Sequence, residues 1–319
     1  MGRPGWLAQG LSAGGAMDRL ALVEGAVLLG QAPGLAVLEI GGSFVRFQTD
    51  APLRLALTGA PMRATCDGAA VAWNAVHAIA EGSIIEVTAQ RGGYGYLSIG
   101  GGIDTPVVLG SRAAHLAAGI GRAVQADDVL PIGLDTGARS GLKLALPDRC
   151  TATALRFTCG PQTKRFDADT LDRFQTTRFT KDARGNRMGQ RLTGGQFASA
   201  DGLSILSEAV LPGDIQITGD GTPFVLLAEC QTTGGYPRIG RVLPCDIPAL
   251  VQLPIGARFT LRHVDIDTAQ DIERTEARRR LALSSALSPL IRDPATIPDL
   301  LGYQLVGGVT RGDDLEDDI

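Results

Sequence analysis

Histidine, cysteine and aromatic residues are scarce in this chain of 319 residues. The three histidines stand singly at positions 77, 115 and 263, which argues against a histidine-rich metal site, so we expect no metal. The five cysteines are an odd number without a C-x-x-C pair, which fits reduced thiols in a cytoplasmic protein better than a disulfide framework. Aromatic residues make up only 5%, which predicts aliphatic cores.

Long apolar runs and clustered positive charge are also missing. No run reaches the roughly 18 apolar residues of a membrane span. The N-terminus lacks the charged-then-apolar layout of a signal peptide. The net charge is −4 and no basic stripe is present, which argues against nucleic acid as a partner. No G-x-x-x-x-G-K-[ST] phosphate loop occurs anywhere in the sequence.

Short apolar runs separated by turn residues are what the chain does contain. The 42 glycines favour many turns, and the runs recur at roughly ten-residue spacing, as in barrels and sandwiches. The length suffices for two domains of ordinary size. We therefore expect a mainly β protein with two β-barrel domains, at residues 1–133 and 152–266, joined by a linker at 134–151 and followed by a helix and tail at 267–319.

Individual elements follow from the same patterns. Helices are predicted at about 16–29, 168–176, 247–252 and 267–283, with Gly30 ending the first and Asp167 capping the second. Asp246 is the expected cap of the third helix, and Asp267 with Gln270 forms an expected capping box for the fourth. Strands are predicted at 36–40, 44–47, 53–58, 69–73, 84–88, 94–99, 129–132, 155–158, 203–206, 214–218, 223–228, 238–243 and 257–264.

One polar stretch, Gln231–Gly240, follows a buried apolar run and carries an amide, two hydroxyls, two glycines and a tyrosine within six residues. Glycines let a backbone approach a ligand closely, so the stretch fits a binding loop. A polar β-turn with the tyrosine packed on a barrel explains the same residues equally well.

A second glycine-rich segment, Gly100–Gly102, precedes Ser111 and Arg112 and could cradle an anion. A tight connection around a barrel rim is the favoured alternative, because neither nucleotide-binding glycine pattern is present. Single residues have similar alternatives. Arg187 could bind a carboxylate bidentately or form a surface ion pair, and Glu208 could be a base or a solvated strand end. Cys230 is the one thiol worth testing, although a buried small residue is the better interpretation.

The motifs also occur in an order that resembles a known family, the biotin-dependent carboxyltransferase / allophanate hydrolase subunit 2 family. They cover about residues 2–275 and are Gly14-Gly-Ala-Met-Asp18, Leu57-Thr-Gly-Ala60, Gly100-Gly-Gly-Ile-Asp104, Gly110-Ser-Arg112, Gly160-Pro-Gln162, Arg187-Met-Gly189, Pro212-Gly-Asp-Ile-Gln216 and Gln231-Thr-Thr-Gly-Gly-Tyr-Pro237. The resemblance implies cyclophilin-like β-barrels. Asn186, Gln190 and Cys230 depart from the family pattern, which often has a carboxylate, a phenol and a cation there.

The resemblance also implies an activity. Members act as the C subunit of an ATP-dependent 5-oxoprolinase, which opens 5-oxoproline to glutamate together with a B subunit, similar to allophanate hydrolase subunit 1, and a third subunit. Other members are the carboxyltransferase module of urea carboxylase, and a third expectation is a non-catalytic regulator that binds a kinase-inhibitor-like partner. The chain has no Met-Lys-Met segment, so biotin would come only in trans, and ATP would act with the complex. The apolar part of the tail could also join two copies of the chain.

Both chemistries activate an amide-like carbonyl, which suits amide and hydroxyl donors around a developing oxyanion. By resemblance, the expected catalytic residues are Glu208, Arg187, Gln231 and Tyr236. The expected substrate-binding residues are Asp18, Arg112, Gln162, Gln216, Thr232, Thr233, Gly234 and Gly235.

Overall fold

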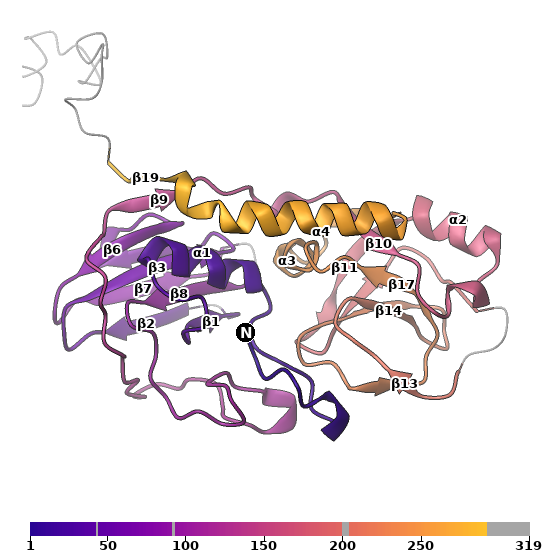
Figure 1. Ribbon diagram of the computed structural model, residues 1–319, viewed down its shortest axis with the longest axis horizontal. Helices are drawn as coiled ribbons and strands as arrows, with labels where there is room; N and C mark the ends of the chain where they lie inside the picture. The colour runs from indigo at the N-terminus through magenta and orange to yellow at the C-terminus, as the bar shows by residue number, and fades with distance from the viewer. Residues whose placement is uncertain (43, 91–92, 200–203, 292–319) are drawn as a thin grey trace, which may run out of the picture.

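A computed structural model describes residues 1–42, 44–90, 93–199 and 204–291. Two β-rich halves lie side by side, and a long helix runs along both of them (Figure 1). The prediction of a mainly β protein with a few helices is confirmed. None of the helices in these ranges is long and apolar enough to cross a membrane.

The first half consists of two sheets and one helix. A six-stranded sheet has the order β1-β8-β3-β6-β9-β19, and a four-stranded sheet has the order β2-β7-β4-β5. Aliphatic residues such as Leu55, Leu57 and Val87 fill the core of this half, as the composition predicted. The elements are α1 (Arg19–Leu29), β1 (Leu38–Ile40), β2 (Phe44–Gln48), β3 (Leu53–Gly59), β4 (Arg63–Cys66), β5 (Ala69–Ala70), β6 (Ala75–Ile79), β7 (Ile84–Thr88), β8 (Gly95–Ile99) and β9 (Leu142–Leu144).

The second half is a closed barrel of seven strands in the order β10-β17-β14-β15-β12-β11-β18. A small sheet of β13 and β16 lies beside it and joins the segment before β14 to the polar stretch. The elements are β10 (Ala154–Thr158), α2 (Ala168–Thr176), β11 (Arg178–Gly185), β12 (Gly189–Thr193), β13 (Glu208–Ala209), β14 (Asp214–Ile217), β15 (Pro223–Leu226), β16 (Thr233–Gly234), β17 (Arg238–Val242), α3 (Ile247–Gln252) and β18 (Arg258–His263).

The core of the barrel departs from the expected aliphatic composition. Phe157, Phe174, Phe179 and Phe197 are all at most 2% exposed, and their neighbouring ring centroids lie 5.0–5.7 Å apart. Such tilted and edge-on pairs add to the burial of apolar area. A low total of aromatic residues therefore did not exclude an aromatic core, because the fold concentrates them in one place.

Two other sequence predictions are wrong. No strand forms at 129–132, where Ile132 makes only an isolated bridge to Ile103, and residues 204–206 are not a strand. Residue 203 lies outside the described residues, as does the tail from 292 onward. Both wrong predictions rested on short apolar runs, which do not by themselves supply a partner strand.

The helices match the sequence patterns more closely. Asp167 accepts a hydrogen bond from the backbone N–H of Thr170, and Gly30 ends α1 in the left-handed conformation, as predicted. The predicted cap of the last helix is wrong by two residues, because Asp265 accepts from Thr268 and α4 spans Ile266–Leu281. Asp246 occupies the N-cap position of α3 without capping it, since its carboxylate binds Arg156.

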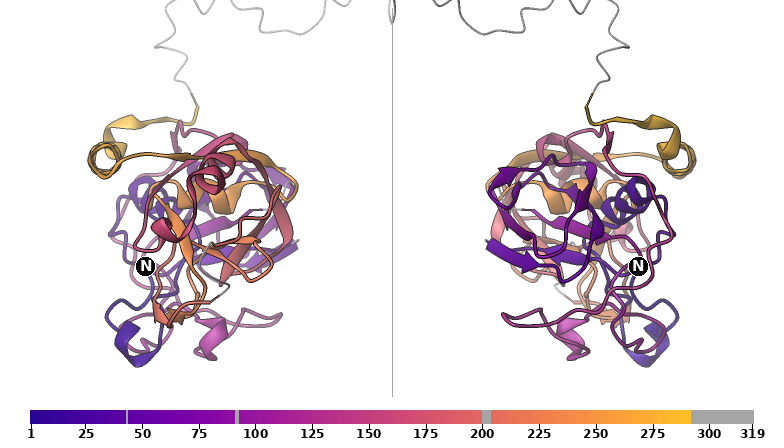
Figure 2. Two further views of the ribbon diagram at one scale, coloured as in Figure 1. Left: turned by 90° about the vertical axis from the view of Figure 1, so that its right-hand side faces the viewer. Right: turned by 90° about the vertical axis from the view of Figure 1, so that its left-hand side faces the viewer.

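Helix α4 and strand β19 (Leu287–Pro289) return the chain from the barrel to the first half. β19 pairs with β9, which lies within the segment predicted as a linker. Figure 2 shows α4 end-on and outside the strands in both views. Because the chain crosses between the halves more than once, their relative position is fixed by several contacts rather than by a single connection.

Candidate active site at the barrel rim

Arg238, at the start of β17, organises a polar cluster at the rim of the barrel. The residue is only 8% exposed. Its Nε donates to Gln162 Oε1 over 2.7 Å, its Nη1 to Asp214 Oδ2 over 3.0 Å and its Nη2 to Glu208 Oε2 over 2.8 Å. The Nε2 of Gln162 donates to the same oxygen of Glu208 over 2.5 Å. The guanidinium therefore holds Gln162 and two carboxylates in fixed positions.

Glu208 and Asp214 differ in exposure. The side chain of Glu208 is 48% exposed, whereas that of Asp214 is 8% exposed and also accepts from the backbone N–H of Leu211. Glu208 is thus the carboxylate that solvent or a ligand can reach, and Asp214 is the one that anchors Arg238 from inside.

Two glutamines continue this cluster. Gln231 Nε2 donates to Gln216 Oε1 over 3.1 Å, and Gln216 is 3% exposed. Gln216 Nε2 has no hydrogen-bond partner among the described residues. A β-carbon at Gly234 would lie 2.3 Å from this nitrogen, so glycine is what makes room for the amide. Gln216 is therefore held between Gln231 and the Gly234 backbone, where it positions the Gln231 side chain.

The β13–β16 sheet places the rest of the polar stretch against Glu208. Glu208 lies opposite Gly234, and Ala209 lies opposite Thr233. The carbonyl of Thr232 accepts a hydrogen bond from the backbone N–H of Val210, and the carbonyl of Gly235 accepts one from the backbone N–H of Ile205. Gln162, Glu208, Gln216, Gln231 and the Thr232–Gly235 backbone, all selected from the sequence, therefore come together in one cluster, which we call the rim cluster.

Arg187 lies elsewhere, at the junction of the two halves. Its Nε donates to Glu229 Oε1 over 2.6 Å, and its other nitrogens bind Glu39 and the carbonyl of Gly15 in the first half. Burial disfavours the charged form, but the carboxylates of Glu39 and Glu229 hold the pKa of Arg187 above its ordinary value. With its donors committed on both sides, Arg187 acts as a connection between the halves.

Asp18, like Arg187, connects the two halves. It is fully buried, caps α1 through the backbone N–H of Ala21, and accepts from Arg149 and from Gln252 Nε2 over 2.8 Å. Arg149 also binds Glu24 through two hydrogen bonds of 2.6 and 2.9 Å. This arrangement ties α1 to α3 and leaves Asp18 without exposed atoms for a substrate.

Arg112 and Tyr236 also lie outside the rim cluster. Arg112 pairs with Asp104 over 2.5 Å, within the long connection that follows β8. Tyr236 is 43% exposed and packs into none of the hydrophobic clusters among the described residues. The alternative of a polar turn with its tyrosine packed on the barrel therefore does not describe this stretch.

The Gly100–Gly102 segment is a tight connection, as the favoured interpretation held. A β-carbon at Gly100 would lie 2.0 Å from Asp135 Oδ2, and one at Gly101 would lie 2.2 Å from the carbonyl of Gly133. The three backbone N–H groups donate to Arg54, Gln31 and Ile99. The carboxylate of Asp135 lies beside the loop, and all three backbone N–H groups already donate hydrogen bonds. The loop therefore has no place for a phosphate.

The departures from the family pattern have structural roles. Asn186 Oδ1 accepts from the backbone of Met188 and Gly189, which closes the turn between β11 and β12. Gln190 is 5% exposed and donates to the carbonyls of Asp182 and Arg191. Cys230 is 3% exposed, and burial raises the pKa of its thiol to about 11, which makes it a buried small residue.

A serine, a histidine and an acid also meet, which spacing in the sequence could not reveal. Ser12 Oγ lies 2.9 Å from His115 Nε2, and His115 Nδ1 lies 3.8 Å from Glu229 Oε2. The backbone N–H of Ala118 donates to Nδ1. Ser12 and His115 are 4% and 3% exposed, so a substrate does not reach the serine, and we assign this group no nucleophilic role.

Sequence reasoning missed Arg238, although it stands within Gln231–Gly240. Its place directly after Pro237 in the polar stretch gave no sign of its partners, and its position opposite Gln216 in the β14–β17 register is known from the structure. Among the described residues no group of three or more histidine, cysteine or acidic side chains could hold a metal ion.

Comparison with known proteins places the chain in a family. Residues 9–263 match the model of the carboxyltransferase domain, subdomain A and B. The C subunit of 5-oxoprolinase from Escherichia coli (strain K12) is 35% identical over 288 residues, which cover 87% of this chain and 91% of that protein. The C subunit of 5-oxoprolinase from Haemophilus influenzae is 33% identical over 282 residues, covering 86% and 90%.

A solved structure extends the likeness to the fold. The K. lactis urea amidolyase has a TM-score of 0.79 at 22% identity, and the match covers 92% of this chain but 20% of that chain. At such identity the likeness concerns the fold alone. The match over residues 9–263 and the identity to both curated relatives show that this chain belongs to the carboxyltransferase family of subdomains A and B.

Proposed function

We propose that this chain is the C subunit of an ATP-dependent 5-oxoprolinase and that it acts with a B subunit and a third subunit. The observation that carries the proposal is the 35% identity to the C subunit of a 5-oxoprolinase across 91% of that protein. The names of the relatives support a multi-subunit assembly, and the identity of its other members is part of the proposal.

The rim cluster is the place where we assign the chemistry. Opening a lactam develops negative charge on its carbonyl oxygen, and preorganised donors stabilise that charge. Gln231, held by Gln216 and more exposed than it, carries the amide donor that we assign to this oxygen. Glu208, half exposed and held by Arg238, is the group we assign to proton transfer.

ATP does not fit the glycine segment of this chain. The backbone donors of Gly100–Gly102 are already used, and Asp135 lies against them. We therefore place no ATP-dependent step on that segment. If biotin takes part, it comes in trans on another chain, and we derive no step through it.

The test is to produce the chain together with its two proposed partner subunits and to measure glutamate formed from 5-oxoproline. We expect ATP-dependent product from the assembled complex. We expect Glu208→Gln to lower the rate by about a hundredfold, because general acid–base catalysis contributes on that order. Glu81→Gln, at an exposed position in the first half, is the matched control and should leave the rate unchanged.

ATP turnover that is indifferent to 5-oxoproline in a properly assembled complex would contradict the proposal. Carboxyl transfer from carboxybiotin to an amide in the same preparation would instead identify the chain as a carboxyltransferase. An unchanged rate in Glu208→Gln would contradict the assignment of proton transfer to the rim cluster. It would not contradict the proposal that the chain is the C subunit of a 5-oxoprolinase.

A further inference from the structure

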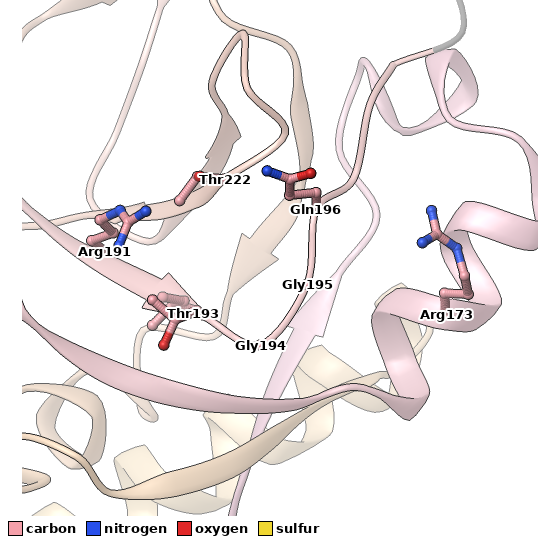
Figure 3. Close-up of a pocket in the computed structure, with 8 residues that line it drawn as sticks. Arg173, Arg191, Thr193, Gly194, Gly195, Gln196 and Thr222 are labelled. Carbon is pink, nitrogen blue, oxygen red and sulfur yellow. The ribbon is translucent and has the colours of Figure 1, made fainter.

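Two features outside the rim cluster differ in whether their polar groups meet. A surface pocket of about 530 Å³ opens on the barrel beside α2 and β12 (Figure 3). Its two arginines, Arg173 and Arg191, stand at opposite ends and do not converge on one point. At the end of β18, in contrast, the thiol of Cys159 and the imidazole of His263 lie in direct contact, and we call them the thiol–imidazole pair.

The thiol–imidazole pair forms because β10 and β18 run parallel and end side by side. Phe157 of β10 lies opposite His263 of β18 in the register, and Cys159 directly follows β10. The Sγ atom of Cys159 lies 3.3 Å from Nε2 of His263, which is within hydrogen-bond distance for sulfur. The two residues are 104 positions apart in the sequence, so the spacing of motifs could not reveal the pair.

Packing and hydrogen bonds hold both members of the pair in place. The imidazole of His263 packs edge-on against Phe157, with ring centroids 5.7 Å apart, and Phe157 is 2% exposed. The backbone N–H that follows His263 donates to the carbonyl of Phe157, which fixes the end of β18. Directly after Cys159, the backbone N–H of Gly160 donates to Thr163 Oγ1 over 2.7 Å. The contact between sulfur and nitrogen therefore rests on backbone that is fixed on both sides.

Cys159 is exposed, whereas the other four cysteines are partly or fully buried. Burial raises the pKa of the thiols of Cys150 and Cys230 to about 11, and it also raises the pKa of the thiols of Cys66 and Cys245. Each of these four thiols also lies near a carboxylate, which disfavours the thiolate. Because the thiolate is the reactive form, these four cysteines are protected from reaction in a way that Cys159 is not.

The imidazole of His263 can accept the thiol proton of Cys159. Its Nε2 faces the sulfur, while its Nδ1 holds no hydrogen bond within the described ranges and the residue is exposed. The proton of the neutral ring can therefore sit on Nδ1 and face solvent, which leaves Nε2 free to accept. A nucleophile and a base within hydrogen-bond reach, with the base held by packing, form the arrangement of an activated thiol.

We propose that Cys159 is a thiol modification site at which a small disulfide, such as oxidised glutathione, forms a mixed disulfide. The thiol proton passes to Nε2 of His263, and the thiolate attacks one sulfur of the small disulfide. A bond forms between Sγ and that sulfur, the original sulfur–sulfur bond breaks, and the leaving thiolate takes up the proton from the imidazolium. The cysteine is oxidised and the released half of the disulfide is reduced, so the step needs no further oxidant. The site shares no residue with the rim cluster and does not depend on the proposed lactam chemistry.

The test is reaction of the folded full chain with oxidised glutathione and with dithiobis-nitrobenzoate at pH 7, followed by mass spectrometry of its peptides. We expect a single glutathionyl group per chain, on Cys159, and loss of the fast reaction in Cys159→Ser. A free thiol is only about 3% ionised at pH 7, so a base that takes its proton can raise the rate by up to about thirtyfold. We therefore expect His263→Gln to slow the reaction by about tenfold. Arg258→Gln, at an exposed arginine on β18, is the matched control and should react as the unsubstituted chain does.

Reaction in urea separates the effect of the imidazole from the reactivity of the thiol itself. In the unfolded chain, Cys159 should react at the same rate with and without the His263→Gln substitution, because the contact with the imidazole is lost. The inference is overturned if any of the other four cysteines is modified faster than Cys159 in the folded chain. It is equally overturned if His263→Gln and Arg258→Gln change the rate alike, or if the difference caused by His263→Gln persists in urea.

Discussion

Replacing Arg238 by methionine tests whether the rim cluster is held together from inside the barrel. The substitution keeps much of the apolar stem and removes the guanidinium that binds Asp214, Glu208 and Gln162. Asp214 is 8% exposed, so its carboxylate would stay buried without its closest cation. Breaking a buried pair from one side costs about 3–5 kcal/mol. Arg241 Nε, 3.8 Å from the same carboxylate, offsets part of this, so we expect about 3 kcal/mol.

The two carboxylates should contribute unequally to this effect. The side chain of Glu208 is 48% exposed, and solvent screens an exposed pair to about 1 kcal/mol or less. Double-mutant cycles of Arg238→Met with Asp214→Asn and with Glu208→Gln separate the two contributions. We expect the coupling to Asp214 to exceed the coupling to Glu208 by about 1–2 kcal/mol.

The assay is urea unfolding followed by circular dichroism, with equal slopes required before free energies are compared. Arg258→Met, at an exposed arginine of β18 in the same barrel, is the control and should change stability by about 0.5 kcal/mol or less. A coupling to Glu208 as large as that to Asp214 would refute the reasoning. So would a total cost for Arg238→Met no larger than that of the control.

Two further substitutions test other parts of the structure. Gly234→Ala places a β-carbon 2.3 Å from Gln216 Nε2, so we expect a loss of about 1–3 kcal/mol in urea unfolding, whereas Gly34→Ala meets no atom within 4 Å and should cost little. Equal costs for the two would contradict this. Burial lowers the pKa of Lys181 from 10.5 to about 8, so the unfolded chain binds more protons between those pH values and the stability contribution of Lys181 rises with pH. Relative to Lys181→Met, the unsubstituted protein should gain about 3 kcal/mol of unfolding free energy between pH 7 and pH 11, and a pH-independent difference would refute the shift.

Local patterns in the sequence determined the helices and most strands. Asp167 and Gly30 mark helix ends through hydrogen bonds and backbone conformation within a few residues, so their signals are local. The predicted strand at 129–132 failed because an apolar run becomes a strand only when a partner strand lies beside it. That partner is set by chain topology, which periodicity does not report.

The ordered motifs also identified the family, and they contain Gln162, Gln216 and Gln231. Glu208 lies in none of these motifs and was selected as a possible base by the general resemblance. Only the tertiary structure separated these residues from Arg187 and Asp18, which lie at contacts between the halves. Only the tertiary structure revealed Arg238, because its partners are 24 to 76 residues away along the chain. Motif order reports which residues a family shares, whereas burial and pairing decide whether a charged residue binds a ligand or another part of the protein.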